Sequence, residues 1–133
     1  MTFTLCCLVG TRAVSQQNEV HSQLNTLNDA RRLLQNADMF HDAVRADVFA
    51  ALMPAADLQS FAQASADDFQ KDAQQFKADI EALKKISLPD PFPSHVGAIQ
   101  SSMNKYLATG EEVIRLAGVG QDSARTRLAE FGF

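Results

Sequence analysis

The sequence contains few residues that interrupt helices. Only six glycines and four prolines occur in 133 residues, and three of the prolines lie together in "SLPDPFPSH". Proline and glycine disfavour helix interiors more than any other residues, so most of the chain is free to form long helices. No segment alternates apolar and polar residues with the two-residue period of a strand. We therefore expect an all-α protein.

Cysteine, basic charge and long apolar runs are also scarce. The two cysteines, Cys6 and Cys7, are adjacent, which fits neither a disulfide framework nor a metal site. The net charge of −4 argues against a nucleic-acid partner, because phosphate binding needs a basic face. The apolar opening "FTLCCLVG" is shorter than the roughly 20 residues of a spanning helix and lacks the features of a signal peptide. We interpret residues 1–10 as the end of a transmembrane helix or as a helix start.

Signatures of catalysis and of cofactor binding are missing as well. The three histidines, His21, His41 and His95, form no two-histidine helical motif of the kind that holds zinc. No glycine-rich phosphate loop and no recognisable serine or cysteine nucleophile motif occurs. We expect no enzyme, no metal and no cofactor.

Four helices are expected, joined by short loops. In chain order they run from about Thr11 to Met53, from the N-cap Asp57 to about Ile86, from the N-cap Ser94 to Gly118, and from the N-cap Asp122 to the end. Short connections make neighbouring helices antiparallel, which predicts an up-and-down four-helix bundle. Phe61, Phe69 and Phe76 recur at helical spacing in the second helix and are expected in the core.

The helix lengths do not balance. The first helix is about 60 Å long at 1.5 Å per residue, whereas the fourth has only about a dozen residues. We expect either that the fourth helix continues beyond Phe133 or that a second copy supplies the missing wall. A bare apolar face of this length is normally covered, which favours a homodimer.

The first helix carries two neighbouring stripes. One is apolar throughout and consists of Leu33, Ala37, Phe40, Val44 and Ala51. The other follows heptad steps through Val20, Leu24, Leu27, Arg31, Leu34, Asp38, His41, Arg45, Val48 and Leu52. Ionisable residues occupy four positions of this mixed seam, and these four are the candidate binding residues: Arg31, Asp38, His41 and Arg45.

Three interpretations of the mixed seam remain open. A buried polar group without a partner costs about 1–3 kcal/mol, so Asp38 is expected to hold His41 while Arg45 stays available to an anion or another chain. The seam is then a polar network that fixes helix register, a small-molecule site at a dimer interface, or a solvated edge. Arginines paired with carboxylates favour the first interpretation, and arginines that converge without carboxylates favour the second.

The run "LNDARRLLQNADMFHDAVRADVFAAL", preceded by "LVGTRAVSQQNEV", resembles the start of the extracytoplasmic sensor region of bacterial methyl-accepting chemotaxis proteins. The resemblance covers roughly residues 5–52, and "DMxHDAxRxDV" is its most specific pattern. It implies a bundle flanked by two membrane helices in the bacterial inner membrane, with the sensor region, residues 11–133, in the periplasm. It further implies a homodimer that binds small molecules between helices, often through arginines.

The function expected from this resemblance is a ligand-sensing domain of a transmembrane chemoreceptor. It would bind a small molecule, for example an anion, and signal through helix movement across the membrane. The alternative is a structural dimerisation or scaffold bundle that binds no ligand.

Overall fold

The computed structural model describes the backbone of residues 2–54 and 57–130 and the side chains of residues 14–54 and 57–129. Its helices are α1 (Thr2–Ala51), α2 (Leu58–Lys84), α3 (Phe92–Ala117) and α4 (Gln121–Glu130). No strand occurs among the described residues. The all-α prediction is confirmed, and so are the number of helices, the long first helix and the short fourth helix.

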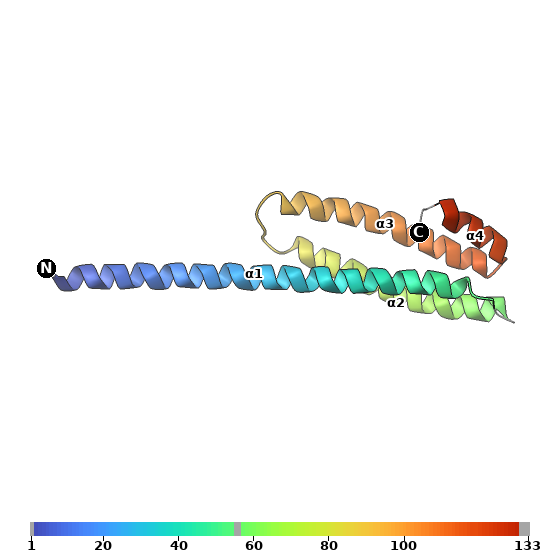
Figure 1. Ribbon diagram of the computed structural model, residues 1–133, viewed down its shortest axis with the longest axis horizontal. Helices are drawn as coiled ribbons and strands as arrows, with labels where there is room; N and C mark the ends of the chain where they lie inside the picture. The colour runs from blue at the N-terminus through green and yellow to red at the C-terminus, as the bar shows by residue number, and fades with distance from the viewer. Residues whose placement is uncertain (1, 55–56, 131–133) are drawn as a thin grey trace.

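The helices run up and down and form one bundle (Figure 1). Helix α2 returns along the C-terminal half of α1, α3 turns back to lie beside both, and α4 folds over the end of α3. A side-chain bond also joins α4 to α1, because Gln121 Nε2 donates to the Ala51 carbonyl at 3.3 Å. This carbonyl lies in the last turn of α1, where no helical N–H is left to bind it.

The predicted caps are confirmed at one helix start and wrong at two. Asp57 caps α2: Oδ1 accepts from the Ser60 N–H at 3.1 Å, and Oδ2 accepts from the Ser60 hydroxyl at 2.7 Å. These bonds hold the pKa of Asp57 below its ordinary value. Helix α3 starts earlier than predicted, at Phe92, so Ser94 lies inside it and donates to the Pro91 carbonyl. Asp122 likewise lies inside the first turn of α4.

The core forms on the apolar stripe of α1. Leu33, Ala37, Val44 and Ala51 are buried, as predicted, while Phe40 is partly buried against the same cluster. The other helices contribute large side chains to this core, chiefly Phe69, Phe76, Ile80, Leu83, Met103, Leu107, Val113 and Ile114. Phe61 is 40% exposed, so its predicted place in the core is wrong.

Three helices meet most closely at Gly110 of α3. A Cβ atom at this position would lie 2.7 Å from Phe69 Cε2 of α2 and 3.1 Å from Val48 Cγ2 of α1. Such distances are below ordinary van der Waals contact, so only glycine lets the three backbones approach this far. Gly110 therefore fixes the separation of α3 from the α1–α2 pair.

Helix α1 extends well past the rest of the bundle. Its N-terminal part runs alone beyond the connection between α2 and α3 (Figure 1). The helix has 50 residues and is about 75 Å long. Val14, Val20 and Leu24 in this part of α1 are at least 50% exposed.

None of the described helices contains a stretch that is both long and apolar enough to cross a bilayer. The backbone of residues 2–10 is helical and continuous with α1, while the side chains that decide between a transmembrane end and a helix start lie outside the described residues.

Substitution of Gly110 tests the close approach of the three helices. Gly110→Ala should lower the free energy of unfolding by about 1–3 kcal/mol, because the added methyl group overlaps the Phe69 ring. Gly97→Ala in the same helix is the control, since nothing lies within 4 Å of its added Cβ. Alanine should there stabilise by about 0.5–1 kcal/mol. Urea denaturation measures both, and a stabilising effect at both positions would contradict this packing.

Candidate functional site

A groove lies where α1 passes the connection between α2 and α3. We call it the connection groove. Its volume is 520 Å³, and its lining comprises Leu27, Ala30, Arg31, Leu34, Gln35 and Asp38 of α1 with Leu88 of the connection and Phe92 of α3. Leucine, alanine and phenylalanine side chains make most of its surface, and Arg31, Gln35 and Asp38 are its polar members. An apolar groove with a few polar groups is the usual form of a small-molecule site.

Two of the four predicted binding residues therefore share one groove. Arg31 and Asp38 are seven residues apart, so they lie on the same face of α1 about 10 Å apart along its axis. Both side chains are exposed, and no described residue forms an ion pair or hydrogen bond with either. The neighbouring Arg32 contrasts with them, because it lies outside the groove and 4.0 Å from Asp29.

His41 lies apart from this groove and belongs to the bundle packing. Its ring centroid is 4.8 Å from that of Tyr106 and 6.2 Å from that of Phe76. The three rings, one from each of α1, α2 and α3, form an aromatic cluster. Burial raises the pKa of Tyr106 to about 12, which keeps its hydroxyl neutral. The predicted Asp38 contact does not form: the carboxylate beside His41 is Asp42, with Oδ1 3.6 Å from Nδ1.

Arg45 also lies apart from the groove. Its guanidinium carbon is 5.6 Å from the centroid of the Phe49 ring, one turn further along α1. It lies about 20 Å along the helix axis from Arg31, so the two arginines do not converge on one ligand. The predicted set of four thus divides into a groove pair, Arg31 and Asp38, and two residues held by aromatic contacts.

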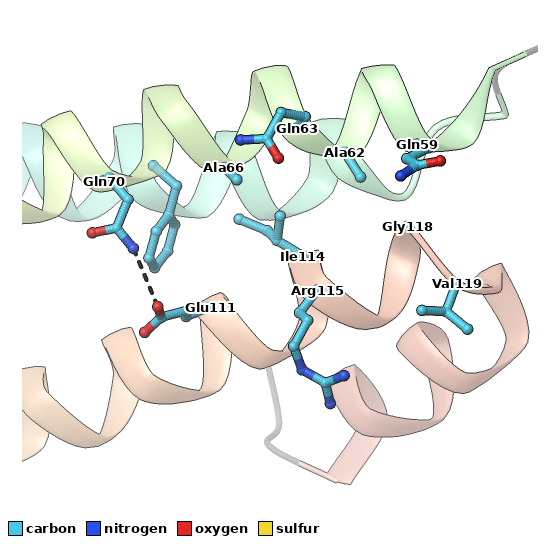
Figure 2. A pocket seen from close by; sticks show the side chains of 11 residues that line it. Gln59, Ala62, Gln63, Ala66, Gln70, Glu111, Ile114, Arg115, Gly118 and Val119 are labelled. Carbon is cyan, nitrogen blue, oxygen red and sulfur yellow. Dashed lines mark hydrogen bonds between the residues drawn. The ribbon is translucent and has the colours of Figure 1, made fainter.

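A second groove, between α2 and α3, was missed by the sequence analysis (Figure 2). Its volume is 390 Å³. Ala62, Ala66, Phe69 and Ile114 form its apolar floor, and Gln59, Gln63, Gln70, Glu111, Arg115, Gly118 and Val119 surround them. The sequence did contain a signal for this groove. Ala62 and Ala66 lie one turn apart on the face of α2 that also carries Phe69, and their small side chains leave space beside α3.

The polar groups of this second groove do not converge on its centre. Gln70 Nε2 donates to Glu111 Oε1 at 3.3 Å across the groove, and Gln63 Nε2 donates to Asp67 Oδ1 at 2.9 Å. The guanidinium of Arg115 points away from α2 (Figure 2). Two glutamines and the glutamate of the second groove are thus hydrogen-bonded within the protein, whereas Arg31 and Asp38 of the connection groove are not.

Asp47 is an ionisable group whose protonation is altered by its surroundings. Burial raises its pKa to about 6, and the nearby carboxylates of Asp72 and Asp68 add to the effect. Its Oδ2 atom is buried and accepts no hydrogen bond. At neutral pH the charged form of this carboxyl group therefore destabilises the packing of α1 against α2.

Metal binding finds no support among the described residues. No three histidine, cysteine, aspartate or glutamate side chains lie close enough together to hold an ion.

Comparisons with models of known families, with curated proteins and with solved structures find no match to this chain. The described residues thus form an all-α bundle with a surface groove that carries two charged side chains.

Asp47→Asn tests the electrostatic cost at the α1–α2 interface. The folded-state pKa of about 6 lies above the ordinary value of 3.8 for an aspartate, so the folded protein binds this proton more tightly than the unfolded chain. Stability attributable to this group is therefore greatest below pH 4 and declines as the pH rises to about 6. Asp47 is half-buried, so we reduce the full shift to an expected gain of about 1 kcal/mol for Asp47→Asn at pH 7.5.

Urea denaturation at pH 4 and pH 7.5 measures this difference. The gain should shrink towards zero at pH 4. Equal effects of Asp47→Asn at the two pH values would contradict the assignment.

Proposed function

We propose that this chain is the ligand-sensing domain of a bacterial transmembrane chemoreceptor and that it binds a small charged molecule in the connection groove. The observation that carries the proposal is the pair of unpaired charges, Arg31 and Asp38, beside an apolar surface. Binding rather than catalysis is the proposed activity. The proposal agrees with the resemblance of residues 5–52 to the sensor regions of methyl-accepting chemotaxis proteins.

The location of the groove supports a sensing role. One wall of the groove is α1, and the other wall is formed by Leu88 and Phe92, which lie where the chain turns from α2 to α3. A ligand that contacts both walls binds more tightly when they are close, so it favours one packing of α1 against the connection. A helix displaced by one or two ångströms is a known form of switching.

The continuity of α1 supports transmission of such a shift. One helix carries the groove residues and then runs alone towards the N-terminus (Figure 1). Movement at Arg31 is then passed along a single rigid element. In the proposed receptor, this element leads to a membrane helix of the bacterial inner membrane, with the bundle on the periplasmic side.

Pairing of two copies is part of the proposal. Val20 and Leu24 lie one helical turn apart on the extension of α1 and are each at least 50% exposed. A second copy of the same helix is the expected cover for this stripe. A mass of one chain in sedimentation equilibrium at micromolar concentration would contradict this part.

A structural bundle without ligand is the second candidate, and one observation favours it. His41 and Arg45, half of the ionisable seam, are accounted for by contacts with aromatic rings of the same chain. Under this alternative, Arg31 and Asp38 are solvated surface charges.

A thermal-shift screen with Arg31→Gln separates the two candidates. The probes are small carboxylates, amino acids and inorganic anions. A ligand at ~100 times its dissociation constant stabilises the folded state by about 2.7 kcal/mol, or roughly 10 °C for a domain of this size. We expect a hit that is lost in Arg31→Gln and kept in the adjacent control, Arg32→Gln. If no probe shifts the wild-type melting temperature, the structural candidate is favoured.

A further inference from the structure

The connection groove places opposite charges at two separate points beside one apolar surface. Arg31 lies nearer the N-terminus of α1 and Asp38 two turns further along the same face. Their separation along the helix axis is about 10 Å. At this distance, with no described partner for either, the two side chains do not neutralise each other.

The surface between these charges is apolar. Leu34 of α1 lies between them in the sequence, and Leu88 and Phe92 form the opposite wall. All three side chains are partly buried and keep some surface open to solvent. Gln35 is the polar group at this level. Methylene groups placed here would leave water for the leucine and phenylalanine side chains, which is favourable by about 25 cal/mol per Å².

We propose that the groove binds an elongated amphoteric molecule, with its carboxylate on Arg31, its ammonium group on Asp38 and its methylene chain against Leu34, Leu88 and Phe92. This inference rests on the proposed sensing function and names the ligand class of the same site. A compact anion would satisfy Arg31 and leave Asp38 as a repulsive charge beside it. A diamine would be repelled by Arg31 in the same way.

The spacing also selects ligand length. A short amino acid brings its two charges too close together to reach both side chains, so it gains one ion pair only. Aminooctanoate, with the amino group on its terminal carbon, carries the same two charges at the ends of a chain long enough to span about 10 Å. Because Arg31 and Asp38 are exposed, each ion pair with the ligand raises its affinity by about threefold to fivefold.

Calorimetric titration of the 133-residue chain tests this ligand class. The probes are ω-aminooctanoate, octanoate, octylamine and ω-aminobutanoate. We expect ω-aminooctanoate to bind about threefold to fivefold more tightly than each of the other three. Octanoate lacks the ammonium group and octylamine lacks the carboxylate. The shorter ω-aminobutanoate carries both charges but cannot span the distance between the two side chains.

Matched variants assign each charge to its side chain. Asp38→Asn should make ω-aminooctanoate bind no better than octanoate, and Arg31→Gln should make it bind no better than octylamine. Asp29→Asn and Arg32→Gln are the controls, because this pair lies outside the groove and should leave all affinities unchanged.

Two different failures can be told apart. If octanoate binds as tightly as ω-aminooctanoate and its binding needs Arg31 but not Asp38, the sensing function stands and the amphoteric ligand class is overturned. If none of these probes and none of the small anions in the thermal-shift screen binds, both proposals are overturned.

Discussion

The packing of this bundle depends on one stripe of α1. Leu33, Ala37, Val44 and Ala51 lie on one face of the helix, and both α2 and α3 bury their apolar side chains against it. Gly110 sets how closely α3 approaches, because any side chain there would overlap Phe69. The mixed seam, one position around α1, is divided by this packing. Val48 and Leu52 are buried in the core, whereas Arg31, Asp38 and Arg45 are exposed. Only the exposed part of the seam is available to a ligand.

The second constraint is the length of α1 relative to its neighbours. Helices α2 and α3 are each about half as long as α1, so their connection lies beside α1 near its middle. The connection brings Leu88 and Phe92 beside the seam at the level of Arg31 and Asp38. The groove, with its apolar surface and two separated charges, forms at this contact. Further along α1, the same seam meets aromatic rings, which engage His41 and Arg45 and leave no comparable site.

The sequence predicted the fold well and the site only in part. Heptad spacing and the scarcity of proline and glycine identified four helices, because these signals are local to each helix. The cap at Ser94 was wrong because Phe92 and Pro93 already start α3, and proline is well suited to a first helical turn. Heptad spacing placed Arg31 and Arg45 on one seam, but it could not show which segment of the chain lies beside each of them. That depends on tertiary packing, as does the space left by Ala62 and Ala66 in the α2–α3 groove.

The central claim is that a ligand lies along α1 with its carboxylate towards Arg31 and its ammonium group towards Asp38. Nuclear Overhauser effects between ω-aminooctanoate and the isotope-labelled protein measure this orientation directly. We expect contacts from the carboxyl-side methylenes of the ligand to Leu27 and from its amino-side methylenes to Leu34, with Phe92 close to its methylene chain. The opposite order of contacts, or contacts confined to the α2–α3 groove, would contradict it.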